Sequence, residues 1–244
     1  MEQVKMINIP TLRLRSVTVE LKELTIKESL SLSVIPAGNF ELSTTSFIKK
    51  ALADANSEID PLKLSVEDRM MIVAHYIASS NDGNPDFAIG RANFSDYLIG
   101  DEKKRVSSID VGEISGDYWQ VRTLTGEYAE SIERTLGATD LPNRVHWIIG
   151  RMACQLVRAE DDFSFDDIDL WLINRIAIFS SFPESDFASL FFAYNQARKE
   201  LNHLFLIDSD DEGLIALPKE EYSSLGAARF PVFTCISRLV KSMA

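Results

Sequence analysis

Hydrophobic positions alternate with polar ones near the start of the chain and then change to helical spacing. Val17, Val19 and Leu21 are separated by polar residues, which is the period of a strand with one buried face. From Thr25 onward the apolar residues follow the period of a helix, and Thr25 with Glu28 forms the T-x-x-E pattern of a capping box. The pattern predicts a strand that enters a capped helix almost without a loop.

A similar order occurs again further along the chain. The dipeptide Leu-Thr at positions 124–125 follows a second alternating run and repeats the one at positions 24–25. Gly126 follows the second threonine, Thr125. The residue three positions after Thr125 is Tyr128 and not a glutamate, so the reciprocal cap is not expected there. We interpret the repetition as recurrent strand-to-helix chemistry rather than as an internal duplication.

Helical spacing dominates most of the remaining chain. Between residues 87 and 116 the pattern instead predicts short strands and loops, and apolar runs at 204–207 and 214–217 predict a hairpin. The fold class predicted is therefore α+β, mainly helical with a small antiparallel sheet. Helices are predicted at residues 47–56 after a cap at Thr44 or Thr45, 65–77 after Ser65, 145–156 after Pro142, 167–179 after a cap of Ser164 with Asp167, and 186–201 after Pro183, with a last helix that Pro231 begins or interrupts and that ends at Ala244.

The clearest turn signal divides the chain into two regions. Residues 79–86 read SSNDGNPD, a cluster of turn-forming residues. We therefore expect an N-terminal strand-helix region at 1–82 and a mainly helical region at 83–244, and the two are also compatible with one continuous domain. A chain of 244 residues with 45% hydrophobic content is long and apolar enough to bury a sizeable core.

The charge balance narrows the classes of partner. With 37 acidic and 25 basic side chains, the formal net charge is −12, which disfavours binding to nucleic acid and to anionic membranes. The most apolar span, residues 170–182, is too short for a bilayer, and the first residues lack the apolar run of an export signal. Cys154 and Cys235 lie in apolar, helix-like surroundings, so we expect buried thiols in a reducing compartment.

Two acidic clusters are candidates for metal chemistry. Residues 208–213 read DSDDEG and resemble the start of a calcium loop, but its closing twelfth position is Lys219, so an acidic hairpin tip is the default. In the second cluster, 160–169, an early helix start would space Asp162, Asp166 and Asp169 along one face. Because acidic residues also collect at helix N-termini, the structural interpretation is favoured, and a metal-dependent enzyme using 160–169 is the alternative.

No pattern of catalytic residues stands out. His75, His146 and His203 lie within predicted helices at spacings unsuited to zinc, and apolar neighbours of Cys154 indicate an inert thiol. We expect no catalytic, cofactor-binding or metal residues and no enzyme activity. The aromatic segments 169–182 and 191–205, with Phe191 and Tyr194, present large residues on more than one helix face, so they belong to the core or to an interface, with the core favoured.

Three stretches carry a resemblance to a known family. They are LTIKE at 24–28, FELSTTSFIKKAL at 40–52 and DPLKLSVEDR at 60–69. Together they resemble the baseplate hub and hub-assembly proteins of T-even-type bacteriophages, over roughly the first third of the chain. Related tail-assembly chaperones of other phages also open with a strand and an L-T turn.

The resemblance implies a role in building a phage tail baseplate through protein contacts and without catalysis. It implies other tail or baseplate proteins as partners, a location in the virion tail baseplate after assembly in the host cytoplasm, and no catalytic residues to carry over. Self-association is compatible with it. A structural subunit, a chaperone absent from the virion and a regulator that binds a host protein are left as alternatives.

Overall fold

The fold is α+β, mainly helical with small antiparallel sheets, as predicted. The computed structural model describes residues 7–14, 17–80, 84–100, 106–158, 160–161, 166–236 and 238–242. The helices are α1 (Ile26–Ser33), α2 (Phe40–Ala51), α3 (Val66–Ser80), α4 (Gly126–Arg134), α5 (Asn143–Gln155), α6 (Ile168–Ser180), α7 (Glu184–Leu201) and α8 (Arg238–Lys241). The strands are β1 (Leu12–Arg13), β2 (Thr18–Val19), β3 (Ala88–Ile89), β4 (Ala92–Asn93), β5 (Ser108–Ile114), β6 (Asp117–Arg122), β7 (Leu156–Arg158), β8 (Leu206–Ser209) and β9 (Leu214–Leu217).

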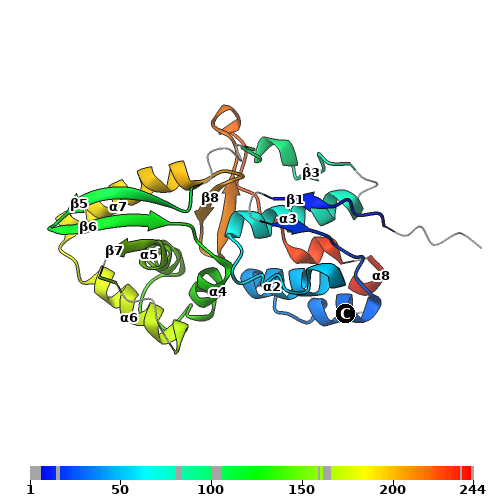
Figure 1. Cartoon of the computed structure of the whole chain (residues 1–244), viewed down its shortest axis with the longest axis horizontal. Coiled ribbons are helices and arrows are strands. Elements are labelled where there is room, and N and C mark those ends of the chain that lie inside the picture. Colours follow the sequence, from blue (N-terminus) through cyan, green and yellow to red (C-terminus); the bar gives the residue numbers. More distant parts are fainter. Residues whose placement is uncertain are drawn as a thin grey trace, which may run out of the picture.

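One half of the molecule is built around a three-stranded sheet. Its strands run antiparallel in the order β5-β6-β7, with a bulge between Asp110 and Gly112. Helix α7 packs along β5 and β6, while α5 packs on β6, β7 and α6. Figure 1 shows α7 on one side of this sheet and α5 with α6 on the other. The sheet is thus covered by helices on both faces, which is how its apolar side chains become buried.

The other half is mainly helical and also holds the short hairpins β1–β2 and β3–β4 (Figure 1). Helix α2 packs on α1 and on α3. From the C-terminal part of the chain, the 3₁₀ turn Val232–Cys235 packs against these three helices and α8 packs against α1. The hairpin β8–β9 lies between the two halves (Figure 1). C-terminal segments thus pack on the N-terminal region, and the predicted division at residue 82 stays a prediction.

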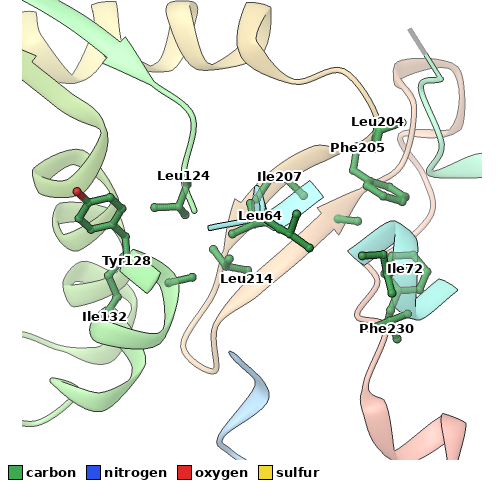
Figure 2. Close-up of a cluster of buried hydrophobic side chains, with 14 of the residues drawn as sticks. Leu64, Ile72, Leu124, Tyr128, Ile132, Leu204, Phe205, Ile207, Leu214 and Phe230 are labelled. Atoms are coloured by element: carbon green, nitrogen blue, oxygen red, sulfur yellow. The ribbon is translucent and has the colours of Figure 1, made fainter. Parts of the chain in front are cut away.

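A shared hydrophobic core joins the two halves. Figure 2 shows Leu64 between Leu124, which precedes α4, and the β8–β9 hairpin, with Ile72 of α3 beside Phe230. Phe205 packs against Phe230, with ring centroids 5.6 Å apart. Full burial of one such side chain contributes about 1.5–3 kcal/mol, so this shared core ties the halves together.

Several helix starts follow the predicted caps. The Thr25 hydroxyl accepts a hydrogen bond from the Glu28 amide, and the Glu28 carboxylate accepts one from the Thr25 amide, as the capping box requires. At α3 the Ser65 hydroxyl accepts from the Asp68 amide at 3.0 Å. The alternating run at the start of the chain is broken into β1 and β2, which pair antiparallel.

Two predicted helix caps are wrong. Helix α2 begins at Phe40, so Thr44 and Thr45 lie inside it, where the Thr44 hydroxyl only bonds back to the Phe40 carbonyl. Helix α6 begins at Ile168, and the cap is Asp167 itself, whose carboxylate accepts from two following amides. The other predicted member of that cap, Ser164, lies outside the described residues.

Candidate functional site

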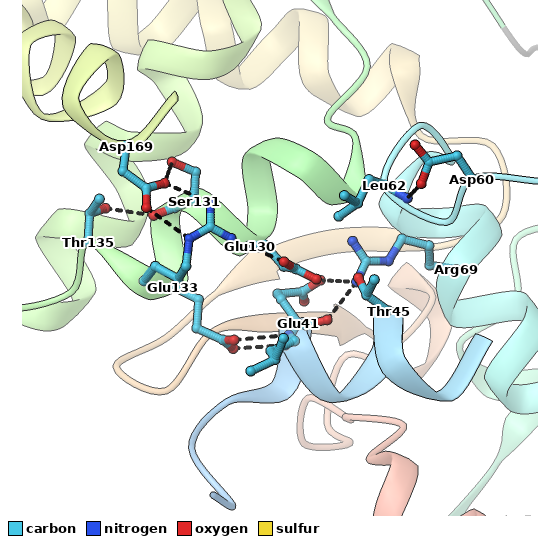
Figure 3. A network of polar contacts seen from close by, with 12 residues as sticks. Glu41, Thr45, Asp60, Leu62, Arg69, Glu130, Ser131, Glu133, Thr135 and Asp169 are labelled. Carbon is cyan, nitrogen blue, oxygen red and sulfur yellow. Dashed lines mark hydrogen bonds and ion pairs between the residues drawn. The ribbon is translucent and has the colours of Figure 1, made fainter. Parts of the chain in front are cut away.

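A buried polar network lies where α2, α3 and α4 meet (Figure 3). Arg69 of α3 is 1% exposed. Its Nη2 donates to the Glu41 carbonyl at 2.8 Å and to Thr45 Oγ1 at 3.0 Å, and it lies 3.3 Å from Glu41 Oε2. Burial raises the pKa of Glu41, and the Arg69 charge opposes that rise. Arg69 therefore joins α3 to α2 through a nearly dry ion pair.

Glu133 of α4 caps helix α2 from outside. Its two carboxylate oxygens accept from the amides of Glu41 at 2.8 Å and Leu42 at 3.0 Å, whereas Asn39, the residue before α2, makes no side-chain cap. Burial raises the pKa of Glu133 to about 7, and the negative charges of Glu41 and Glu130 add to this rise against the two amide hydrogen bonds. This carboxyl group is an N-cap supplied across the fold.

At the outer end of the network, α4 is joined to α6. Arg134 donates to both oxygens of Asp169, from Nη2 at 2.7 Å and from Nε at 2.9 Å, and Ser131 donates to the same carboxylate at 2.7 Å. The Arg134 hydrogen bonds hold the pKa of Asp169 below its usual value. The bidentate geometry makes this a positioning contact between two helices.

A second buried network orders the chain after α7. One oxygen of Glu67 accepts from the amides of His203, Leu204 and Phe205 at 2.8–3.0 Å. Although burial alone would lower the pKa of His203, the carboxylates of Asp68 and Glu67, which lie 3.9 Å and 3.0 Å from its ring nitrogens, raise it to about 9. His203 follows the end of α7, so its predicted place inside a helix is wrong. This histidine is a charged structural partner.

The described carboxylates of the 160–169 cluster serve the fold. Asp161 lies 3.1 Å from Arg158 and 2.7 Å from Arg175, and its pKa is lowered because these contacts outweigh its burial. The predicted helical spacing of Asp166 and Asp169 is wrong, because Asp166 precedes the start of α6. Asp162 lies outside the described residues. Among the residues that the structure describes, no group of three or more histidine, cysteine or acidic side chains is arranged to hold a metal ion.

The acidic segment 208–213 forms the tip of a hairpin, as its default interpretation predicted. Asp208 accepts from Arg151 at 3.1 Å and from Arg198 at 3.3 Å. Asp210 and Glu212 both pair with Arg229. These arginines neutralise the carboxylates that a calcium ion would need.

The remaining sequence candidates are also structural. His75 bonds to the Pro10 carbonyl at 2.7 Å, and buried His146 bonds to the Ile132 carbonyl at 3.0 Å. Cys154 and Cys235 are free, buried thiols, as predicted. Burial raises the pKa of Cys154 well above its usual range, which keeps it protonated and unreactive.

The aromatic helices belong mainly to the core, as predicted. Tyr194 is 2% exposed and donates to Gln155 at 2.7 Å, and Phe191 is partly buried. Phe192 is the most exposed large apolar side chain of the two helices, at 68%, and Leu170 and Ile178 of α6 are also exposed, at 56% and 54%. The sequence carried a signal for Phe192, since it lies off the apolar stripe formed by Leu190, Tyr194 and the later core residues of α7.

An open groove extends from the exposed face of α7. It has a volume of about 540 Å³ and is lined by apolar side chains that include Val106, Ile109 and Leu206, with Lys199 and Glu200 at its side. Phe192 and Lys199 are seven residues apart in one helix, so they share a face about two turns apart. We name Phe192 and these five groove residues the α7–β5 surface, and it is the candidate contact site.

Comparison of the chain with protein-family models, curated proteins and solved structures found no match. No helix in the described part of the chain has the length and apolar content to cross a membrane.

Proposed function

We propose that this chain is a non-enzymatic structural or assembly protein of a bacteriophage tail baseplate and acts through protein contacts. The proposal starts from the resemblance of residues 24–28, 40–52 and 60–69 to baseplate hub and hub-assembly proteins of T-even-type phages. Its partners would be other tail or baseplate proteins, and its place the virion tail baseplate after assembly in the host cytoplasm.

One observation supports the proposal in addition to the short matching stretches: residues of these stretches contact one another in the fold. Glu41 and Thr45 come from the second stretch and Arg69 from the third, and the three side chains bind one another in a buried network. Leu24, from the first stretch, donates its amide to the Tyr76 hydroxyl of α3. Residues of the separated stretches therefore contribute to the same packed group of helices. This supports the view that the stretches together encode one folding unit.

Action through contacts is supported by the α7–β5 surface. An exposed phenylalanine on the same helix face as an open, largely apolar groove is typical of sites that other proteins cover, because burying large apolar side chains drives association. A tail-assembly chaperone that leaves before the virion is complete would use the same kind of surface. No specific observation favours the metal-dependent alternative, since Asp161, Asp167 and Asp169 are already bound by arginines or by helix amides.

Recovery from infected cells tests the proposal. The tagged chain is produced during infection by a T-even-type phage, and proteins that co-purify from the lysate and from finished particles are identified by mass spectrometry. Tail proteins in both samples support a structural subunit, and tail proteins in the lysate alone support a chaperone. Their absence from both samples would overturn the phage-tail proposal.

A matched pair of variants tests the surface. Phe192→Glu places a charge on the α7–β5 surface and is expected to abolish co-purification of tail proteins. Val34→Glu is the control, because Val34 is also a strongly exposed apolar residue, at 77%, but lies at the end of α1 in the other half. Both variants should melt close to the wild type, and equal losses from both would argue against this surface.

A further inference from the structure

We infer that a second pocket, between the β5–β6 turn and the α6–α7 loop, binds an arginine or lysine side chain of a partner protein. The pocket has a volume of about 190 Å³. Its lining includes Ile114, Asp117, Trp119, Phe182, Asp186 and Leu190. The inference rests only on the part of the proposed function that says the chain acts through protein contacts.

The size of the pocket suits one side chain. Sites for whole small molecules usually measure about 300–1,000 Å³, so this pocket is smaller than such a site. An open pocket that takes one large side chain of a partner is the usual setting of a binding hot spot. The shape therefore favours an inserted side chain over a free metabolite.

Both walls of the pocket are held by contacts within the fold. The hairpin closes through the two-residue turn of Ser115 and Gly116, which both have positive φ, 55° and 87°, as a type I′ turn requires. On the other side Phe182 stacks on Phe179 at 5.4 Å, and Phe179 meets Trp119 at 6.0 Å. A preformed pocket costs little ordering when a side chain enters.

The chemistry of the lining selects a cation. Aromatic rings attract cations through their negative faces, and carboxylates bind guanidinium or ammonium groups through charge-assisted hydrogen bonds. The chain already uses this chemistry once at the same place. Arg158 lies 5.3 Å from the Trp119 ring and donates to Asp117 at 2.9 Å.

Asp186 is the carboxylate that is left for a partner. It lies partly buried in the first turn of α7, and no described residue makes a hydrogen bond or ion pair with it. The nearby guanidiniums of Arg158 and Arg175 are already matched by Asp117, Glu160 and Asp161. The unmatched charge in the pocket is therefore negative, in a chain whose net charge is −12.

Titration of the full chain with a short peptide tests the inference. The probe is the blocked tripeptide acetyl-Gly-Arg-Gly-amide, and the readout is the indole N–H signal of Trp119 in the ¹⁵N-labelled protein, assigned with Trp119→Phe. We expect a saturable shift of this signal, with Trp147 and Trp171 unchanged. The same peptide with citrulline, which is neutral but has nearly the same shape, should bind at least about tenfold more weakly, because it lacks the charge.

A matched pair of variants locates the binding group. Asp186→Asn should weaken binding of the arginine peptide about tenfold, the scale of one charge-assisted hydrogen bond in a partly open pocket. Glu184→Gln removes an exposed carboxylate from the same helical turn, outside the pocket lining, and should leave binding unchanged.

Three results would overturn the inference: no saturable shift at about 20 mM peptide, equal binding of the citrulline peptide, or equal effects of the two variants. The titration uses the purified chain without phage proteins. If the peptide binds but no tail proteins co-purify from infected cells, the phage assignment alone is overturned. If tail proteins co-purify but the peptide does not bind, the pocket inference alone is overturned.

Discussion

The two Leu-Thr turns share a dipeptide, but the hydrogen bonds that stabilise them come from different parts of the chain. At the first turn the Thr25 hydroxyl accepts a hydrogen bond from the Glu28 amide at 3.2 Å, and the Glu28 carboxylate accepts one from the Thr25 amide at 2.8 Å. At the second turn Thr125 makes no side-chain cap, and its buried hydroxyl oxygen has no hydrogen-bond partner among the described residues. The first helix start is stabilised locally and the second is not.

The main chain of a distant segment replaces the missing cap. The amide of Gly126 donates to the Leu64 carbonyl at 2.9 Å, and the Val66 amide donates to the Leu124 carbonyl at 3.0 Å. The starts of α3 and α4 therefore satisfy each other's polar groups, which a helix start cannot leave buried and unpaired. An identical dipeptide can thus depend on its own neighbours in one place and on tertiary pairing in another.

The largest expected effect comes from adding a methyl group at the second turn. A Cβ at residue 126 would collide with the Arg69 guanidinium and lie 2.8 Å from the Pro61 carbonyl oxygen. Gly126→Ala should therefore cost about 3 kcal/mol in urea unfolding, because it overpacks the turn and disturbs a buried ion pair. Gly38→Ala is the control, since nothing lies within 4 Å of its added Cβ. Equal stability of the two variants would contradict the role of Gly126.

The next effect concerns the cap that α4 gives to α2. Glu133 has a pKa of about 7 in the fold against a usual 4.5, so its contribution to stability is complete below about pH 4.5 and is lost as pH rises through 7. Glu133→Gln keeps an acceptor oxygen without the titration. Wild-type stability relative to this variant should fall by about 1–2 kcal/mol from pH 4.5 to 8, discounted for partial solvent access. A pH-independent difference in urea unfolding would contradict this expectation.

A smaller loss is expected at the first turn. Thr25→Ala removes the side-chain acceptor for the Glu28 amide and should cost about 1 kcal/mol, or about 2–4 °C in melting temperature. Thr44→Ala is the control, because that hydroxyl lies inside α2 and only bonds to the Phe40 carbonyl. The local-cap explanation fails if calorimetry gives the same melting temperature for wild type and Thr25→Ala.

The smallest effect is expected at the matching threonine of the second turn. Thr125→Val replaces a buried hydroxyl that has no described partner by a methyl group of similar size. Stability should stay within about 0.5 kcal/mol of the wild type, because no hydrogen bond is lost. A loss above about 1 kcal/mol in urea unfolding would show that this hydroxyl is bonded in solution, and the two turns would then be more alike.

Predictions from the sequence succeeded where the stabilising contacts are close in the chain. The capping box at Thr25, the Ser65 cap of α3 and the β8–β9 hairpin all depend on residues a few positions apart, so spacing reveals them. The prediction for α2 failed because its cap is Glu133, 92 residues from the Glu41 amide that it binds. No local window contains both partners.

The sequence by itself determined the α+β class, the net charge of −12 and most helix starts, because propensity, hydrophobic period and side-chain caps act over a few residues. The tertiary structure alone decided which of the described carboxylates bind arginines and amides, and it placed Asp186 in a pocket without a partner among the described residues. It also decided that the Glu133 carboxylate, from α4, caps the start of α2. Pairing and burial depend on the packing of segments that are distant in the chain, and this packing cannot be predicted from the spacing of neighbouring residues.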